Sequence, residues 1–152
     1  MGIELLPVQE HDLPLIESWL VQPHVARWFG AKSDWLTEIA SNLHSDWIWH
    51  FRVDANGTPI GFVQYYDVAK APPGPWSHQP PHTYGIDFLV GSTEALRQGY
   101  GKAMLTSLYE TIQQRHGPCR VVADPDEENV ASIRALRSAG FHRDFATGLC
   151  IR

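Results

Sequence analysis

Cysteine is scarce in this chain: Cys119 and Cys150 are the two among 152 residues. They form no Cys-x-x-Cys pair and no Cys/His cluster at metal-ligand spacing, which argues against a disulfide framework and against a metal site. We expect both thiols to be reduced and buried. Basic residues are also few, with 12 Lys and Arg against 17 Asp and Glu and a net charge of −5. This balance argues against nucleic-acid or anionic-membrane binding and favours cationic partners.

Long apolar runs are missing as well. No segment approaches the ~20 apolar residues that a membrane-spanning helix requires. The amino terminus has no basic stretch followed by an apolar run, the pattern of a secretory signal. We therefore expect a cytoplasmic protein. Because 152 residues is about the length of one domain, the chain is predicted to form a single domain over residues 1–152, and its 43% hydrophobic residues predict that this domain folds alone.

Apolar periodicity predicts strands and helices along the whole chain. In the amino-terminal half these are a strand at 3–8, helices within 13–20 and 35–43, and a hairpin over 47–66 with its turn at 54–57. Pro23 interrupts the first helical pattern, so the residues up to Gly30 are predicted to be a connection. In the carboxyl-terminal half they are a strand at 84–90, a helix at 102–116, a strand at 119–123, a helix at 128–138, and an irregular strand or pair of strands at 141–151.

The predicted order is therefore β-α-α-β-β-β-α-β-α-β. Parallel neighbours are expected only where a helix intervenes, so the sheet should be antiparallel in its amino half and βαβ in its carboxyl half. This is an α/β fold (an α+β mixed sheet) in a single mixed layer sandwich. Residues 71–81 contain five prolines and predict a long loop, which is either functional or a stiff connector.

The segment Leu96-Arg-Gln-Gly-Tyr-Gly101 lies between a predicted strand and a predicted helix. Its two glycines let backbone amides approach a ligand at the start of the helix, where phosphates bind. It matches neither the Walker nor the Rossmann glycine pattern. On its own, such a segment is also compatible with an ordinary strand-to-helix turn.

Together with a later Asn129 and Ser138-Ala-Gly-Phe141, this segment resembles the GNAT superfamily of acyl-CoA-dependent N-acyltransferases. The resemblance extends over nearly the whole chain. Within the superfamily it is closest to the aminoglycoside 6′-N-acetyltransferases. The motifs that carry it are Trp19-Leu20, His24 with Trp28-Phe29-Gly30, Pro59-Ile60-Gly61-Phe62 before Gln64, Gly85-Ile86-Asp87, and Asp124-Pro125 with Asn129 and Ile133-Arg134.

The resemblance implies a GNAT-like fold with a splayed central strand pair and acetyl-CoA as co-substrate. Its pantetheine arm would lie like an added strand between the strand of Asp87 and the strand that ends at Asp124. The pyrophosphate would lie on the glycine-containing loop, and the Asn129 side chain would bind the pantetheine. The implied cofactor-binding residues are Leu89, Val90, Arg97, Gln98, Gly99, Tyr100, Gly101, Lys102 and Asn129.

Two positions depart from the family pattern. Leu96 stands where relatives often carry Gln or Arg, which removes one side-chain contact to the pyrophosphate. Leu136 stands where many relatives have a tyrosine that protonates the leaving thiolate. A thiolate can leave at neutral pH without being protonated by the enzyme. Leu136 is therefore expected to lower the rate of acyl transfer without preventing the reaction.

Asp87 and Asp124 are the candidate catalytic residues, and both are also candidate substrate-binding residues. Asp87 interrupts an apolar strand, where a carboxylate either pairs with other groups or serves a site. The resemblance favours a role for Asp87 in binding the substrate ammonium and removing its proton. Asp124 precedes Pro125 and a helix, so a capping role is equally compatible with it.

Trp28 and Trp76 are the other candidate substrate-binding residues, because neither lies on a periodic apolar face. Trp76 is equally compatible with a hydrophobic plug that pins its loop to the domain. His82 is an alternative base, although a lone histidine is more often structural.

The sequence therefore predicts transfer of an acetyl group from acetyl-CoA to a primary amine of a small cationic acceptor. The 6′-amino group of an aminoglycoside is the preferred acceptor. Two alternatives stay open: a siderophore-precursor N-acyltransferase and a non-catalytic acyl-CoA-binding regulatory module. Either a monomer or a homodimer is compatible with the sequence.

Overall fold

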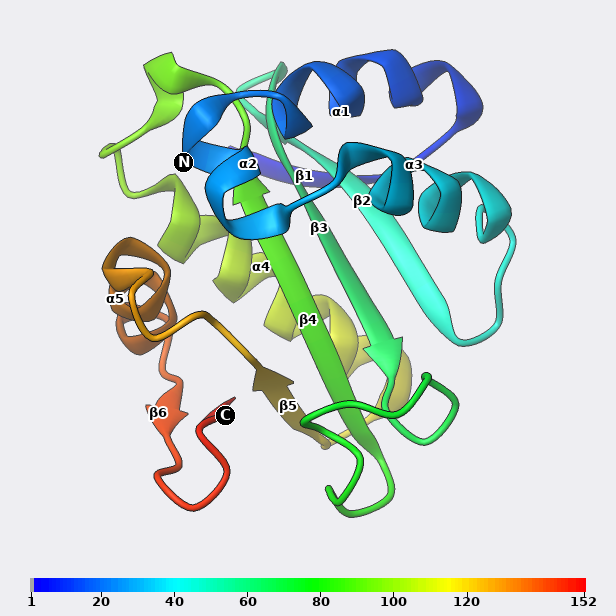
Figure 1. Ribbon diagram of the computed structural model, residues 1–152, viewed down its shortest axis with the longest axis vertical. Coiled ribbons are helices and arrows are strands. Elements are labelled where there is room, and N and C mark those ends of the chain that lie inside the picture. Colours follow the sequence, from blue (N-terminus) through cyan, green and yellow to red (C-terminus); the bar gives the residue numbers. More distant parts are fainter. Residues whose placement is uncertain (1) are drawn as a thin grey trace.

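The computed structural model describes residues 2–152, which form one seven-stranded sheet with helices on both faces (Figure 1). The strand order is β1-β2-β3-β4-β5-β7-β6. The strands are β1 (Ile3–Pro7), β2 (Ile48–Ala55), β3 (Thr58–Asp67), β4 (Thr83–Val90), β5 (Arg120–Ala123), β6 (His142–Arg143) and β7 (Cys150–Ile151). Within this described part, β4 and β5 run parallel and every other pair is antiparallel. The mixed sheet and its antiparallel amino half are confirmed.

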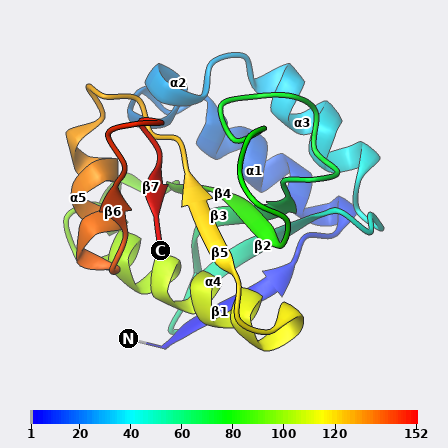
Figure 2. The same ribbon diagram turned by 90° about the horizontal axis from the view of Figure 1, so that it is seen from below.

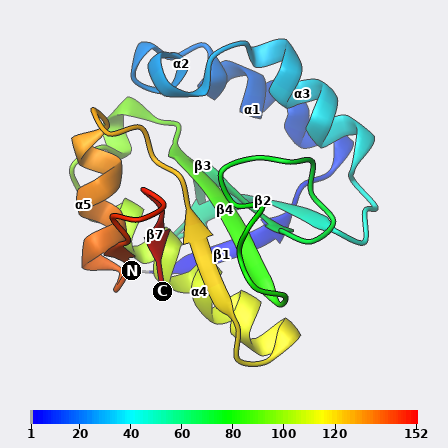
Figure 3. The ribbon, with the colours of Figure 1, turned by 60° about the horizontal axis from the view of Figure 1, so that its bottom comes forward.

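Three helices cover one face of the sheet: α1 (Leu13–Leu20), α2 (Pro23–Phe29) and α3 (Lys32–Ser41). The other face is covered by α4 (Tyr100–His116) and α5 (Val130–Ser138), and Figure 3 shows the two helical layers on opposite sides. Phe62 and Leu89 point into the core under α1–α3, whereas Val63 and Ile86 point into the core with α4 and α5. Alternate residues of each strand thus face different helical layers.

The α2 helix corrects the prediction that residues up to Gly30 form a connection. Gln22 is extended and Pro23 occupies the first turn of α2, where a missing N–H breaks no hydrogen bond. Pro23 therefore begins a helix as well as ending the previous pattern. The seven residues of α2 bury Val25 as their only fully buried side chain, so they carry no apolar repeat.

The remaining elements follow the predictions with small shifts. The hairpin turn is formed by Asn56 and Gly57, both at positive φ, as a tight two-residue turn requires. The predicted irregular segment at the carboxyl end forms the short pair β6 and β7, which Figure 2 shows beside β5. Both cysteines are free thiols; Cys150 is buried, but Cys119 is only half-buried, contrary to expectation. None of the helices in residues 2–152 is long and apolar enough to cross a membrane.

The central strand pair separates partway along its length. The parallel pairing of β4 and β5 runs from Thr83 with Arg120 to Ile86 with Ala123. Beyond that point β4 continues to Val90, while the chain after β5 turns toward α5 (Figure 1). One edge of β4 is therefore left without a strand partner over residues 87–90, and the expected splay is present.

Candidate active site at the splayed strand pair

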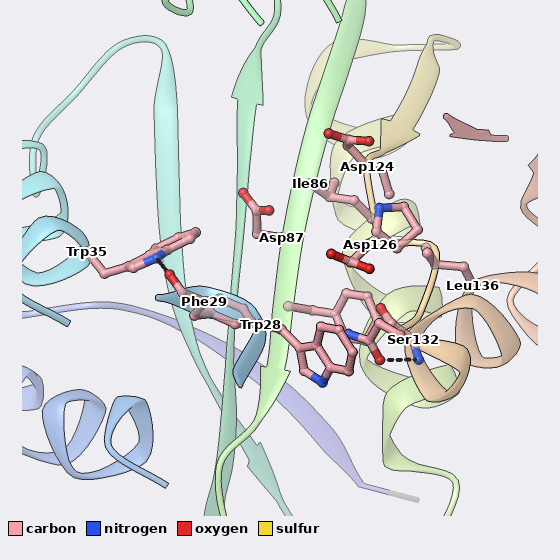
Figure 4. Close-up of a pocket in the computed structure, with 13 residues that line it drawn as sticks. Trp28, Phe29, Trp35, Ile86, Asp87, Asp124, Asp126, Ser132 and Leu136 are labelled. Atoms are coloured by element: carbon pink, nitrogen blue, oxygen red, sulfur yellow. Dashed lines mark hydrogen bonds between the residues drawn. The ribbon is translucent and has the colours of Figure 1, made fainter. Parts of the chain in front are cut away.

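A cleft opens where β4 and β5 separate. It encloses about 530 Å³, open solvent included. Side chains from α2, α3, β4, β5, α5 and the segment after β5 line it (Figure 4). They are Trp28, Phe29, Trp35, Ile86, Asp87, Phe88, Ala123, Asp124, Pro125, Asp126, Asn129, Ser132 and Leu136.

Asp87 is the first residue of β4 beyond the last pair with β5. Its carboxylate accepts a hydrogen bond from Nε2 of Gln64, its partner on β3, at 2.8 Å. Burial raises the pKa of Asp87 to about 6, the Gln64 bond opposes that rise, and the charges of Glu38 and Asp124 add to it. Asp87 is therefore a stronger base than an exposed aspartate and is still ionised at neutral pH.

Asp124 follows the last paired residue of β5 and lies on the opposite side of the β4 ribbon from Asp87 in Figure 4. Burial raises its pKa, Arg143 lowers it, and Asp126 raises it further. The described lining residues include three aspartates and neither Lys nor Arg. The cleft thus suits a cation. Over residues 2–152, no three His, Cys, Asp or Glu side chains are grouped so as to hold a metal ion.

The free edge of β4 offers backbone groups to a strand-like ligand. The N–H of Gly91 donates to the carbonyl of Ile60 on the β3 side. Because successive residues of a strand turn their backbone groups to alternate sides, Phe88 and Val90 present theirs to the open side. Nε2 of His24 already lies 2.8 Å from the Val90 carbonyl oxygen. The backbone groups of Phe88 and Val90 are therefore better placed than those of Leu89 to hydrogen-bond a strand-like ligand, because the Leu89 carbonyl faces Gly61 of β3.

The glycine-containing loop leads directly into α4. Gly99 precedes the first helical residue with φ +78°, a left-handed conformation that favours glycine, and Arg97 before it has φ +62°. Since α4 begins at Tyr100 and not at the predicted Lys102, the amides of Tyr100, Gly101 and Lys102 belong to its first turn. The first-turn amides of a helix have no carbonyl partner within it and attract anions.

The side chain of Asn129, the position of Gly101 and the side chain of Gln98 bear on the other predicted cofactor contacts. The side-chain oxygen of Asn129 accepts a hydrogen bond from the N–H of Ser132 at 3.2 Å and so caps α5, which leaves the amide NH₂ for a ligand in the cleft. Gly101 of α4 approaches α5 closely, because a Cβ there would lie 3.3 Å from Cβ of Ala135. The exposed side chain of Gln98 donates to the carbonyl of Glu94 within the loop.

Aromatic side chains form one wall of the cleft. The indole N–H of Trp35 donates to the carbonyl of Phe29 at 2.8 Å, and the two rings lie 4.8 Å apart. Trp28 has the guanidinium of Arg27 over its ring at 4.5 Å. The predicted substrate-binding Trp28 thus does line the cleft, and it lies where a cationic acceptor would meet an aromatic face.

Trp76 and His82 are not among the cleft-lining residues. Trp76 packs edge-on against Tyr66 at 5.4 Å, and its N–H donates to the carbonyl of Pro72. These contacts are those of the hydrophobic plug that the sequence also allowed. His82 packs against Tyr84 at the start of β4, the end of the strand remote from Asp87. Substrate binding by Trp76 stays a prediction without support from these contacts.

Sequence reasoning missed several members of the site. Trp35 lies on the apolar face of α3 and packs against the core, but it is only half-buried and also reaches the cleft. Nothing in the sequence marks Phe88 or Ser132 as a site residue except that Phe88 follows Asp87 and Ser132 lies three residues after Asn129. Gln64 follows the Pro59–Phe62 motif, but its contact with Asp87 depends on the β3–β4 register.

A splayed strand pair, a helix amino terminus and carboxylates at the point of separation are the features that the resemblance to acyl-CoA-dependent transferases implies. Residues 8–147 match the family described as "Acetyltransferase (GNAT) domain". The chain belongs to this GNAT acetyltransferase family and is an acetyl-CoA-dependent N-acetyltransferase.

Characterised relatives are similar over nearly the whole chain. The aminoglycoside N(6′)-acetyltransferase type 1 of Klebsiella pneumoniae is 28% identical over 150 residues, covering 93% of this chain and 75% of the relative. The crystal structure of aminoglycoside acetyltransferase AAC(6′)-Ib with coenzyme A superimposes with a TM-score of 0.87 at 26% identity, covering 99% of this chain and 94% of that one. Its structure with coenzyme A and kanamycin gives 0.85 at 25% identity, with coverages of 99% and 94%.

Proposed function

We propose that the protein transfers the acetyl group of acetyl-CoA to the 6′-amino group of an aminoglycoside. The observation that carries this proposal is the pair of carboxylates, Asp87 and Asp124, at the point where β4 and β5 separate. The activity named for the relatives supports the choice of acceptor.

The described residues fit acetyl-CoA. The first turn of α4 and the left-handed Gly99 offer backbone amides for its pyrophosphate. The free edge of β4 offers Phe88 and Val90 for a strand-like pantetheine arm, and Asn129 offers its amide from the opposite side. When bound there, the thioester supplies an acyl group that is already activated.

Asp87 acts as the base. An amine is protonated at neutral pH and must lose a proton before its nitrogen can attack the acetyl carbonyl carbon. Asp87, ionised at neutral pH with a pKa of about 6, accepts that proton directly or through water. The new C–N bond forms as the C–S bond breaks, and the sulfur leaves with the bonding electrons. One of the two protons that the attacking nitrogen still carries then passes to the thiolate or to water, which leaves a neutral amide.

Leu136 shows that this chain does not protonate the sulfur from the position that many relatives use. The side chain is fully buried and contributes an apolar surface to the cleft. An ordinary thiol has a pKa of ~8.5, so the thiolate is a good leaving group without a dedicated acid. The hydroxyl-bearing side chain of Ser132, one turn before Leu136 on α5, lines the same cleft, where it could donate a hydrogen bond to the sulfur.

Asp124 and Asp126 bind the acceptor. Both lie beside the cleft and contribute negative charge, while Trp28 and Trp35 provide aromatic faces. A polycationic amino sugar suits such a surface, because its ammonium groups pair with carboxylates and its ring faces stack on aromatic side chains.

A single assay tests the proposal: release of free thiol from acetyl-CoA in the presence of a panel of amines. We expect rapid release with an aminoglycoside that carries a 6′-amine and none with a matched aminoglycoside that carries a 6′-hydroxyl. Proton NMR of the product identifies the acetylated nitrogen. Turnover only with longer acyl-CoA substrates and siderophore precursors would contradict the proposal, and so would coenzyme A binding without turnover.

A further inference from the structure

Three polar side chains form a row across the centre of the sheet. His50 of β2 lies opposite Gln64 of β3, and Gln64 lies opposite Asp87 of β4. Directly opposed residues on one face of a sheet have Cβ atoms about 4.5 to 5.5 Å apart, so their side chains meet. The row lies under the α1–α3 layer, because the His50 ring stacks on Phe62 of that core.

In this row Gln64 is hydrogen-bonded to Asp87 but not to His50. Gln64 donates from Nε2 to Asp87 at 2.8 Å. Its other amide atom, Oε1, is buried and accepts no hydrogen bond from any group in residues 2–152, and both ring nitrogens of His50 are buried without a partner there. A neutral imidazole carries one N–H donor, and an amide oxygen is an acceptor. The unpaired groups of the two neighbours are therefore complementary.

The His50 ring is uncharged at neutral pH. It is 5% exposed, and burial lowers its pKa to about 4, with the Gln64 side chain acting in the opposite sense. Leaving a buried donor and a buried acceptor unpaired is unfavourable, because each has lost its hydrogen bonds to water without gaining a partner in the protein. A rotation of the His50 ring that brings its N–H to Oε1 of Gln64 would pair both groups without disturbing the Gln64–Asp87 hydrogen bond.

We propose that His50 is a positioning residue for the base Asp87: its ring N–H donates to Oε1 of Gln64 and holds the amide with Nε2 toward the carboxylate. The inference rests on the proposed role of Asp87. A flipped Gln64 amide would place Oε1 against the carboxylate oxygen and favour the protonated acid. A fixed amide favours the ionised form that can accept a proton from the acceptor ammonium.

The charges around Asp87 make the Gln64 hydrogen bond important for the pKa of that carboxyl. The titratable groups that face it are Tyr66 of β3, Glu38 of α3, and Asp124 and Asp126 of the segment after β5. Each is neutral or negative at neutral pH. Within residues 2–152, Gln64 is the one group that lowers the pKa of Asp87 against burial and its acidic neighbours. Its orientation therefore sets how much of the base is ionised.

Carbon-13 NMR of labelled aspartate carboxyls measures the pKa of Asp87 without any turnover, with the signal assigned by its loss in Asp87→Asn. We expect Gln64→Met to raise that pKa by about one unit and His50→Phe to raise it by about half a unit. His50→Gln, which keeps an N–H donor, should restore the wild-type value. Glu38→Gln should change the pKa of Asp87 in the opposite direction: it removes a negative charge that raises this pKa, so the pKa should fall.

The wild-type protein gives a second readout: a ring N–H proton of His50 that is shifted downfield and protected from exchange. Its absence, or a pKa of Asp87 that does not change in His50→Phe, would overturn the inference even in an active enzyme. The acidic limb of the kcat/KM profile should move with the NMR value. If the carboxyl responds as expected but no amine is acetylated, the proposed function fails and the positioning role stands.

Discussion

Asp87 and Asp124 are the first residues beyond the last pair between the parallel strands β4 and β5, and both line the cleft that opens there. The charge of Asp124 is one of the causes of the raised pKa of Asp87, whereas the pKa of Asp124 is raised by burial and by Asp126 and lowered by Arg143. Their environments differ: Asp87 is bonded to Gln64, whereas Asp124 lies on the exposed side and near Arg143. That difference suits one carboxylate to proton transfer and the other to acceptor binding.

Substituting Gly99 should weaken coenzyme A binding. In Gly99→Val a branched side chain would stand at the left-handed residue that precedes α4, where the pyrophosphate would approach the backbone. We expect the Kd for coenzyme A, measured by calorimetry, to rise roughly ten-fold or more. Gly57→Val is the matched control, because Gly57 has φ +81° in the hairpin turn with nothing within 4 Å of a Cβ. Equal affinities for the two folded variants would contradict the predicted pyrophosphate site.

Neutralising Asp124 should affect acceptor binding at least as much as turnover. Asp124→Asn keeps the shape of the side chain but removes a charge from the cleft. We expect the KM for a polycationic acceptor to rise roughly ten-fold, in line with the loss of a charge-assisted hydrogen bond. Asp46→Asn, an exposed carboxylate paired only with Lys70 at 3.8 Å, controls for net charge. The assignment is wrong if KM is unchanged in Asp124→Asn.

Ligand charge should determine thermal stabilisation. A ligand that binds the folded state raises the melting temperature by mass action. With three aspartates along the cleft, a polycationic amino sugar should raise it, whereas a neutral sugar of similar size should not. Equal shifts for the two ligands at moderate salt would argue against an acidic acceptor site.

Asp87 should destabilise the fold at neutral pH. Its pKa rises from 3.8 to about 6 on folding, so the folded protein holds this proton more tightly than the unfolded chain does. Stability conferred by the group is therefore present at low pH and is lost as the pH rises from about 4 through 6. Asp87→Asn should be more stable than wild type by about 1 to 3 kcal/mol at pH 7.5, with the gain vanishing near pH 4. Urea denaturation across this pH range measures the difference, and a gain that is independent of pH would contradict the account.

The sequence predicted much of the framework because local patterns determine it. The hairpin turn at Asn56-Gly57, the period-two strands and the helix predicted over 102–116 are each specified within a few residues. The α2 helix was not predicted, because it spans two turns and buries a single residue fully. Apolar repeats cannot reveal so short a helix.

The site was predictable only in part, since much of it depends on pairing between distant strands. Asp87 stands out as a carboxylate within an apolar strand, and the loop before α4 stands out by its glycines. By contrast, the contact of Gln64 with Asp87 follows from the β3–β4 register, and the position of Trp35 follows from how α3 packs on the sheet. Such relationships between elements leave no signal in a single sequence.

The pH dependence of acetyl transfer in wild type and Asp87→Asn tests the account most directly. With a 6′-amino aminoglycoside as acceptor, kcat/KM of the wild type should rise through about pH 6 and level off above it, following the ionisation of Asp87. In Asp87→Asn, the rate should fall roughly 100-fold or more and this limb should disappear, while affinity for coenzyme A stays near wild type. A variant that keeps a near-normal rate and the same acidic limb would show that the base is another residue.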